Sequence, residues 1–280
     1  ASYQANADNR FELYAIGAPQ RHGQNLYKQN IGAYDSEFAE SVEGYDTEAL
    51  GADGKFKDVG HLFNQNWAPI DASYTGKQYY YMYGAKTVDR HDPNFLNERE
   101  NFFHKPLVNL NHFMTINDKT NLSSVLYWSG GSGGGTGTYG RIPTLDADGK
   151  LGGENYKFYY GRGPWTRDWN TLVDYNSGTD DVVYVDKRAI SREAGQSVGI
   201  LRNSINRQNT YGLISKLHYD ISDELKLQVG LDWRTAGIEH AREVRDLMGG
   251  DFYMDFADKN APNGKKVGLG DIIAYHNETT

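Results

Sequence analysis

The chain of 280 residues contains no cysteine. A disulfide framework, a thiolate metal site and a cysteine nucleophile are therefore excluded, which fits export through an oxidising periplasm. The sequence also has no stretch that approaches the roughly 18 consecutive apolar residues of a membrane-spanning helix. It has no basic run either, and its formal net charge is −8, so we expect no nucleic-acid partner.

The sequence is also poor in apolar residues overall. Its mean hydropathy of −0.71 would ordinarily indicate a soluble protein. A transmembrane β-strand, however, alternates outward apolar with inward polar residues, so that its average is hydrophilic as well. The chain is rich in tyrosine and glycine, with 21 Tyr and 32 Gly, and aromatic residues make up 13% of the sequence. Such a composition is typical of proteins in which rings line the membrane interfaces and strands meet long loops.

Two neighbouring segments in the last third of the chain have a period of two. Between Tyr211 and Ile221 every second residue is Tyr, Leu or Ile, apart from Ser215. Between Leu225 and Trp233 every second residue is Leu, Val or Trp. This alternation predicts two strands, and the short polar segment between them predicts a tight turn. Each strand is about ten residues long, which is the length that a tilted strand needs to cross a bilayer.

Two further turns are expected in the first half. Residues 108–116 and 122–128 alternate in the same way, with His112 as an exception, and Asn117 to Asn121 form the turn between them. Asn6-Ala7-Asp8-Asn9 forms a third turn, which leads into a strand from Arg10 to about Ala18. The few residues before this turn are then the tail of another strand.

The predicted fold class is all-β, a partial transmembrane antiparallel β-barrel of about five strands with long extracellular loops. The strands are expected at about 10–18, 106–116, 122–129, 209–221 and 225–238, and the loops at about 19–105, 130–208 and 239–280. Residues 1–280 are thus expected to form part of a single barrel domain. Periplasmic turns of such barrels are short and extracellular loops long, so the tight turns are assigned to the periplasm.

The chain is expected to be a fragment of a larger protein. About five strands cannot close a barrel, and hydrocarbon cannot satisfy open sheet edges. The start Ala1-Ser2-Tyr3-Gln4 lacks the basic residues and apolar core of a signal peptide, which predicts a processed start or a fragment. A fragment is the favoured interpretation.

Several motifs resemble chemical sites without the context that such sites need. Gly135 to Gly140 matches G-x-G-x-x-G, but no helix or βαβ unit follows, so a flexible base of a loop is favoured. Asp146 and Asp148 resemble the start of a calcium loop, yet the later ligands are missing, and a turn of Asp and Gly is favoured over a metal site. Residues 239–248 are expected to form a short amphipathic stretch just above the membrane. Asp180-Asp181 is interpreted as a solvated acidic turn.

No arrangement of serine, histidine and aspartate typical of hydrolases is visible, so no enzyme activity and no cofactor are expected. The inward rows of the predicted strands carry polar side chains that would face the barrel lumen. These residues are Lys216, His218, Lys226, Asp232 and Arg234. Simple wetting of the lumen, or contact with a plug, is favoured over specific ligand contacts.

Three stretches resemble the TonB-dependent receptors of Bacteroidota. They are Gly17-Ala18-Pro19-Gln20-Arg21-His22-Gly23-Gln24, the stretch from Arg90 to Asn101 followed by His104-Lys105-Pro106, and Leu201 to Asn206 ahead of Tyr211-Gly212-Leu213. The resemblance implies a 22-stranded barrel in the outer membrane of a Gram-negative bacterium, with a plug domain that is absent from these residues. It also implies import driven by the TonB–ExbB–ExbD complex through that plug, and a surface lipoprotein as a further partner.

In this family the long loops capture the ligand. The resemblance therefore nominates loop residues as ligand-binding candidates, namely Arg21, His22, Tyr79, Tyr80, Trp165 and Trp169. The expected function is import of a scarce nutrient such as an iron chelate, cobalamin, an oligosaccharide or a peptide. Two alternatives stay open. One is a barrel of another kind, a porin or the anchor of a surface adhesion or secretion assembly. The other is a secreted all-β domain that binds or hydrolyses carbohydrate.

Overall fold

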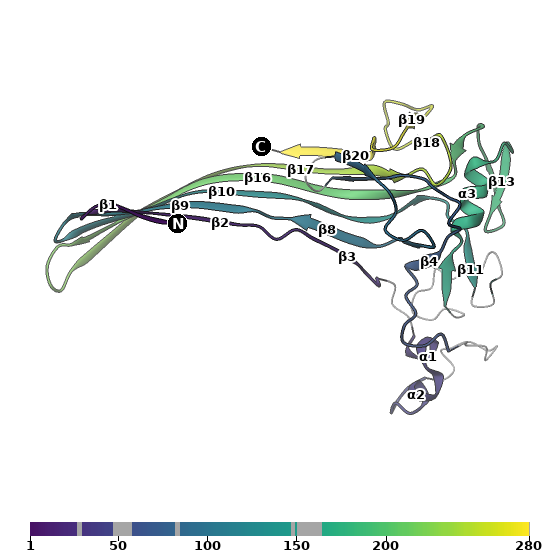
Figure 1. Ribbon diagram of the computed structural model, residues 1–280, viewed down its shortest axis with the longest axis horizontal. Helices are drawn as coiled ribbons and strands as arrows, with labels where there is room; N and C mark the ends of the chain where they lie inside the picture. The colour runs from purple at the N-terminus through teal and green to yellow at the C-terminus, as the bar shows by residue number, and fades with distance from the viewer. Residues whose placement is uncertain (27–29, 47–57, 82–84, 147–148, 150–163, 280) are drawn as a thin grey trace.

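The computed structural model describes residues 1–26, 30–46, 58–81, 85–146, 149 and 164–279. Its main element is a nine-stranded sheet with the path β1-β2-β9-β10-β16-β17-β20 (Figure 1). These strands span Ser2–Asn6, Asn9–Ile16, Leu107–Asn117, Thr120–Gly140, Gly199–Asp220, Lys226–Asp246 and Ile272–Thr279. β3 (Gln20–Gly23) pairs with β8 (Glu100–His104), which pairs with β10. Every pair in this sheet is antiparallel, so the all-β antiparallel class is confirmed.

All three predicted tight turns are present, and they lie together at one end of the sheet, which we call the turn end (left in Figure 1). Asparagine side chains shape two of them. Asn6 Oδ1 accepts from the backbone N–H of Asp8 at 3.0 Å, and Asn117 Oδ1 accepts from that of Lys119 at 2.9 Å. These are the local bonds that favour Asn at turns. The long segments between hairpins gather at the opposite end, the loop end.

The strands are longer than the sequence predicted. β10, β16 and β17 have 21, 22 and 21 residues. Residues 130–140 and 199–208, expected as loop, are therefore strand, and the prediction of a flexible glycine-rich loop base was wrong. The predicted amphipathic stretch at 239–248 was also wrong, because β17 continues to Asp246. β20 was expected to be loop, yet it pairs with β17 between Ile238 and Glu243.

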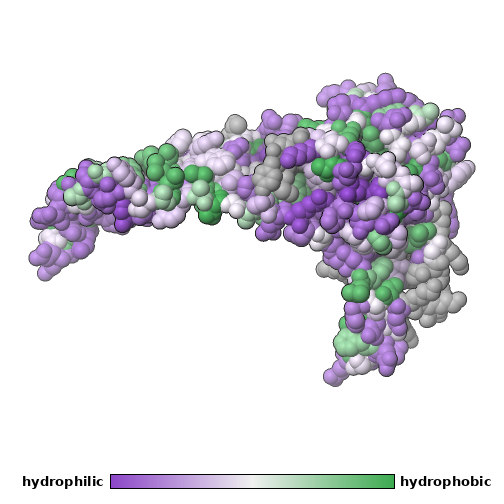
Figure 2. All heavy atoms as spheres, in the orientation of Figure 1, coloured by the Kyte–Doolittle hydropathy of each residue, from purple (hydrophilic) through white to green (hydrophobic). Residues whose placement is uncertain are grey.

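The two faces of the sheet differ in its turn-end half. Leu13, Leu110, Leu126, Leu213 and Trp233 lie opposite one another in a single row across five strands. We call the face that carries this row the apolar face, and the other the polar face. Figure 2 shows apolar side chains along the turn-end half of the sheet, which projects from the rest of the molecule as an arm. The period of two predicted from sequence is confirmed.

The exceptions in the apolar pattern are neighbours in the sheet. His112, Ser124 and Ser215 occupy one row of adjacent strands. The two serine hydroxyls lie 2.8 Å apart, and the His112 ring stacks on Phe11 with centroids 4.5 Å apart. Nε2 of His112 also lies 2.9 Å from Oδ1 of Asn9. The polar side chains on the apolar face therefore find hydrogen-bond partners in one another.

The segments at the loop end contain short helices and strands of their own. The helices are α1 (Ile31–Tyr34), α2 (Ser36–Glu40) and α3 (Trp169–Ser177). The strands are β4 (Trp67–Pro69), β5 (Gln78–Tyr81), β6 (Ala85–Val88), β7 (Phe95–Asn97), β11 (Thr144–Asp146), β12 (Trp165–Arg167), β13 (Val182–Val185), β14 (Arg188–Ser191), β15 (Gln196–Ser197), β18 (Phe252–Asp255) and β19 (Lys265–Val267). Within the described part of the chain, no helix has the length and apolarity to cross a membrane.

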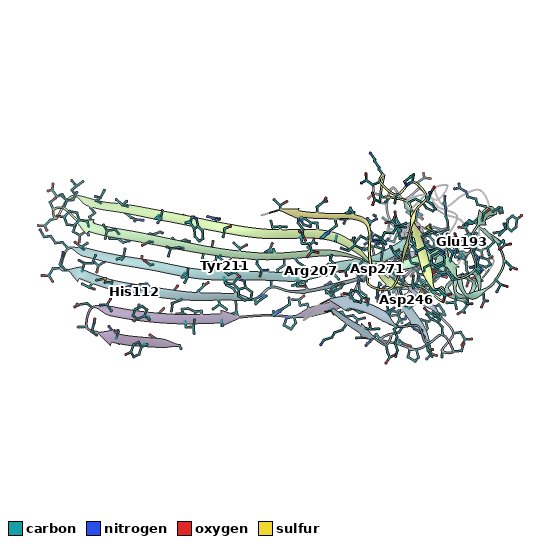
Figure 3. All side chains as sticks on the ribbon, turned by 90° about the horizontal axis from the view of Figure 1, so that it is seen from above. His112, Glu193, Arg207, Tyr211, Asp246 and Asp271 are labelled. Carbon is teal, nitrogen blue, oxygen red and sulfur yellow. The ribbon has the colours of Figure 1, made fainter. Side chains whose placement is uncertain are left out.

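Two apolar clusters fasten these segments to the sheet. The larger cluster includes Ala68, Leu96, Trp169, Leu172 and Leu201, and it joins β4, β7 and α3 to the start of β16. The smaller consists of Ile200, Val244, Val267 and Ile273. Successive residues of β16, Ile200 and Leu201, thus enter different clusters. Both faces of the sheet are covered by protein at the loop end, whereas its arm is bare (Figure 3).

Asn176 holds α3 in place. Its side-chain amide donates to the carbonyls of Gly199, Leu247 and Met248 at 2.9, 3.1 and 3.0 Å, and its Oδ1 accepts from the N–H of Val198 at 2.8 Å. At the other end of the helix, Asp168 accepts from the N–H of Thr171 at 3.0 Å as an N-cap. These bonds fix the loop segment on the ends of β16 and β17.

Candidate functional site

A buried network of charged side chains lies where β5 packs on the end of β17 and covers the sheet. Glu100 accepts from Nη2 of Arg21 at 3.0 Å and from Nη2 of Arg245 at 2.7 Å, and Tyr80 donates its hydroxyl to the same carboxylate. Both guanidinium groups also contact the Tyr80 ring, that of Arg21 at 4.4 Å and that of Arg245 at 4.8 Å from the ring centroid. Burial disfavours the ionised Glu100, but the two arginines outweigh it and hold its pKa below the usual value.

An irregularity of β17 brings two consecutive residues to this network. Leu201 pairs with Asp246 and Arg202 with Val244, so Arg245 is an extra residue in β17. Arg245 reaches Glu100, and the Asp246 carboxylate accepts from the hydroxyl of Tyr74 at 2.5 Å. Burial raises the pKa of Asp246. The bulge therefore lets both side chains of a consecutive pair bind the segment that covers the sheet.

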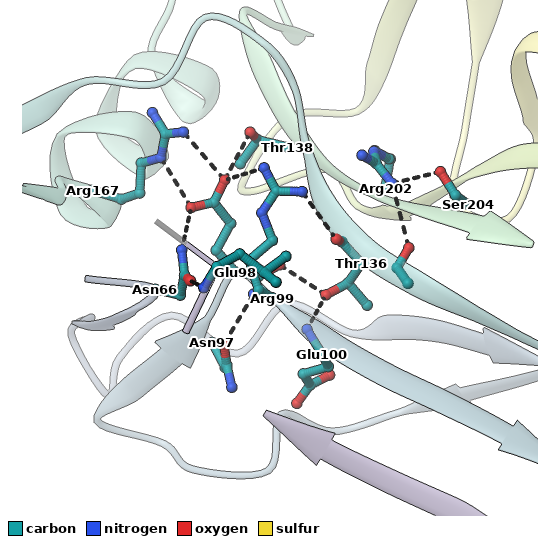
Figure 4. Close-up of polar contacts among 12 residues, drawn as sticks. Asn66, Asn97, Glu98, Arg99, Glu100, Thr136, Thr138, Arg167, Arg202 and Ser204 are labelled. Atoms are coloured by element: carbon teal, nitrogen blue, oxygen red, sulfur yellow. Dashed lines mark hydrogen bonds and ion pairs between the residues drawn. The ribbon is translucent and has the colours of Figure 1, made fainter. Parts of the chain in front are cut away.

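Glu98 forms a second buried centre (Figure 4). Its carboxylate is bound by Arg167 at 3.2 Å, by Arg99 at 3.5 Å and by the Thr138 hydroxyl at 3.1 Å. Although burial opposes its ionisation, Arg167 and Arg99 keep its pKa below the usual value. Glu98 thereby links β7, β10 and β12, which are far apart in sequence. Both networks have paired charges and close packing, which indicates a structural role.

An open groove lies on the polar face, next to these networks. Gly131, Gly133 and Gly135 of β10 form its floor, and its volume is about 240 Å³. Phe103 of β8 and Asn206 of β16 lie opposite Gly133 and form the walls. The hollow exists because these glycines of the central strand have no side chains, and we call it the glycine groove. It combines an aromatic ring with amides, the kind of lining that binds a polar organic ligand.

Gly135 is the open point of the floor. A Cβ atom built there would meet only the Glu100 carbonyl oxygen, at 3.9 Å. At Gly133, in contrast, a Cβ would come within 2.5 Å of the Phe102 carbonyl oxygen, so the close approach of β8 requires glycine there. The glycines thus serve two purposes, tight strand packing and open space.

The ligand-binding candidates nominated from sequence lie in different environments. Arg21 and Tyr80 belong to the Glu100 network. Trp165 and Trp169 are 5% and 0% exposed and pack in the interior of the loop end. The Tyr79 carbonyl accepts from Nδ2 of Asn203 at 2.8 Å. Whether any of these residues binds a ligand stays a prediction. His22 is exposed and pairs with Asn101, which lines the glycine groove.

The residues predicted to face the lumen all lie on the polar face in its turn-end half. They are Lys216, His218, Lys226, Asp232 and Arg234, and all are exposed. Asp232 and Arg234 form an ion pair at 2.5 Å, and Lys226 lies 3.6 Å from Asp220. His218 lines an open hollow of about 370 Å³ near the turn end.

Sequence reasoning missed one cluster of potential metal ligands. Among the described residues, Glu239, His276 and Glu278 come close enough to share an ion, with His276 Nε2 at 3.2 Å from each carboxylate. Arg207 already binds Glu239 at 2.9 Å, which favours an ion-pair cluster over a cation site. Of the two calcium candidates, Asp146 is the last residue of β11, and Asp148 lies outside the described residues.

The glycine groove was also missed. Its lining comes from β8, β10, β16 and β17, and only the register of the sheet brings these strands together. Comparison of the chain with protein-family models, with curated proteins and with solved structures finds no match.

Proposed function

We propose that the chain forms part of the wall of a transmembrane β-barrel in the outer membrane of a Gram-negative bacterium. The observation that carries this proposal is the exposed apolar face. Leu227, Val229, Leu231 and Trp233 are 45%, 54%, 59% and 53% exposed, on one face of a single strand. A contiguous apolar surface of this kind, spread over five strands, is costly in water and is suited to lipid.

The dimensions of the apolar face support the same proposal. It extends from Leu225, the residue before β17, to Trp233 within that strand. At ~3.3 Å per residue and a tilt of roughly 45°, this stretch rises by about 20 Å. Aromatic side chains border it: Tyr219 near the turn end, and Tyr211 and Trp233 toward the loop end. An apolar band with aromatic girdles at both edges is the pattern of outer-membrane barrels.

The arrangement of connections gives the orientation. The three tight turns lie at one end and the long segments at the other, so we assign the turn end to the periplasm and the loop end to the cell exterior. β1 and β20 each have one neighbour in the described sheet. Unpaired edges are untenable in hydrocarbon, so the proposal requires further strands, as in a 22-stranded barrel.

Within this class we propose a TonB-dependent importer, on the strength of the sequence resemblance. The polar face then lines the lumen, and the glycine groove lies in its outer half on the route of an incoming ligand. Energy would come from the TonB–ExbB–ExbD complex through a plug domain, with a surface lipoprotein as a further partner. The ligand classes are those expected from the sequence: an iron chelate, cobalamin, an oligosaccharide or a peptide.

Refolding tests the membrane part of the proposal. Residues 1–280 expressed alone should form inclusion bodies and should not refold to a monomer in the absence of detergent or lipid, because the apolar face has no other cover. Recovery of a cooperative monomer without detergent would instead support the secreted all-β alternative.

Binding to TonB tests the energy-coupling part. The full-length protein, purified in detergent, should retain the purified periplasmic domain of TonB in a pull-down. A porin or an adhesion anchor, the remaining alternative, would show no such binding while still fractionating with the outer membrane.

A further inference from the structure

Three arginines converge on the polar face at the outer end of the glycine groove. Arg202 of β16 lies opposite Gly137 of β10, and Arg242 of β17 lies opposite Ser204. Nη1 of Arg99 and Nη2 of Arg202 both come within 3.0 Å of the position that a Cβ of Gly137 would take. The guanidinium groups of two segments that are distant in sequence thus share the space left by a glycine.

The positive charge of this cluster is poorly compensated. Arg99 has Glu98 at 3.5 Å, but that carboxylate also binds Arg167. Among the described residues, no carboxylate comes within 4.0 Å of Arg202 or Arg242. Arg202 donates instead to the neutral Ser204 hydroxyl at 2.6 Å and to the Gly135 carbonyl at 3.3 Å. The Arg242 guanidinium lies over two aromatic rings, those of Tyr139 at 5.3 Å and Tyr275 at 5.2 Å.

Burial adds to the cost of holding these cations close together. The Nε atoms of Arg202 and Arg242 are both buried without a hydrogen-bond partner in the described structure. Burial first, and the charges of Arg242 and Arg99 next, lower the pKa of Arg202 to about 10. Partly buried cations that repel one another destabilise a fold, so an anion that binds among them would be strongly favoured.

The neighbouring groove supplies a place for the rest of such a ligand. Asn206 and His240 lie opposite each other and are hydrogen-bonded through Oδ1 and Nδ1. Together with Phe103 they provide the Asn206 amide N–H, imidazole and ring surface beside the open floor at Gly135. Amides and a flat ring suit the hydroxyls and the apolar faces of a sugar or a hydroxy acid. The arginines lie at the end of this surface, where they would meet an acidic substituent.

We propose that Arg202 and Arg242 bind a carboxylate of the ligand, with Arg99 adding to the positive field, while the remainder of the ligand lies in the glycine groove. The ligand is thus an acidic organic molecule, either a uronate-bearing oligosaccharide or a small polycarboxylate chelator. That this ligand is imported rests on the proposed function, but the binding itself does not.

Isothermal titration of the full-length protein in detergent micelles tests this site. The probes are trigalacturonate, citrate and the neutral maltotriose. We expect at least one of the two acids to bind, with an affinity that falls as salt increases, and to bind at least tenfold more tightly than maltotriose. Binding of trigalacturonate alone identifies the acidic sugar, and binding of citrate alone identifies the chelator.

Substitutions locate the binding. Arg202→Gln and Arg242→Gln should each weaken binding of the acid by about tenfold or more, since each removes a charge-assisted contact. Arg202→Lys should lose less, because it keeps the charge. The control is Arg234→Gln, on the same face and strand as Arg242 but in the turn-end half, and it should bind like the wild type. The circular dichroism spectrum and melting temperature in micelles verify that each variant is folded.

The outcomes separate the two proposals. Three results would each overturn the carboxylate site, even if the protein resides in the outer membrane. They are failure of both acids to bind, equally tight binding of maltotriose, and unchanged affinity for the acid in folded Arg202→Gln and Arg242→Gln. Failure to fractionate with the outer membrane would overturn the proposed function, while acid binding by the purified protein would still support the site.

Discussion

An arginine at Val229 tests the apolar face at its centre. Val229 of β17 is midway between Trp233 and Leu225, the residue before the strand, and its side chain is 54% exposed. On the lipid-facing side of a barrel, an arginine at the midplane costs about 2–4 kcal/mol, a reduction of roughly 30- to 700-fold in the folding equilibrium. The same substitution near either interface costs about 0–1 kcal/mol. We therefore expect Val229→Arg to be far more destabilising than Leu225→Arg.

The assay is urea-dependent unfolding of the full-length protein in lipid vesicles, followed by tryptophan fluorescence. The matched control is Gln228→Arg, one residue away on the polar face, where Gln228 lies opposite His218. This control should cost only a small fraction of the Val229 value, because its side chain enters a wet lumen. Equal losses of the free energy of unfolding for Val229→Arg and Gln228→Arg would refute the assignment of the two faces.

Three further changes probe the loop end. Glu98→Gln should cost about 3–5 kcal/mol, because it leaves buried arginines unpaired. Because folding lowers the pKa of Glu98, the ionised carboxylate stabilises the fold fully above its unfolded-state pKa, and this stabilisation is lost as the pH falls through its folded-state pKa. The melting temperature of Glu98→Gln should therefore fall less steeply with decreasing pH than that of the wild type. Asn176→Ala should lose several kcal/mol from buried bonds, seen as faster hydrogen exchange in α3, and unchanged exchange would contradict the role of Asn176 in holding this helix. Gly135→Leu should fill the glycine groove and abolish acid binding at unchanged stability, whereas Gly237→Leu, also on an open position, should leave binding intact.

The turn-end half of the fold could be predicted from the sequence because two different environments impose the alternation. On β17, lipid-suited residues such as Leu227 and Leu231 alternate with Gln228 and Asp232, and no helix has that period. The exceptions, Ser124 and Ser215, could not be explained from one strand alone. Only the register shows that they satisfy each other across β10 and β16.

The loop-end half gave no such signal. The run from Gly130 to Gly137 has almost no side chains to alternate, so it resembles a flexible linker although β8 and β16 pair with it. At the start of β16, Ile200 and Leu201 are both buried, because protein covers both faces there. Periodicity disappears where the two faces of a strand have similar surroundings, and the sequence is then misread as loop.

The candidate site was missed for a related reason. Arg99, Arg202 and Arg242 are far apart in sequence, and three strands must pair before they meet. One signal was available, since counting back from the predicted turn at residues 222–224 places Ser204 opposite Arg242. The two tryptophans nominated for ligand binding pack in the interior, because a large ring gains most from burial.

Lipid contact of the apolar face is the central claim, and single-cysteine scanning of β17 measures it most directly. The chain contains no native cysteine, so each introduced thiol can be labelled alone with a fluorophore. In vesicles that contain brominated lipid, we predict strong quenching at odd positions from Leu227 to Trp233 and weak quenching at the even positions between them. Uniform quenching, or none at the odd positions, would contradict the account.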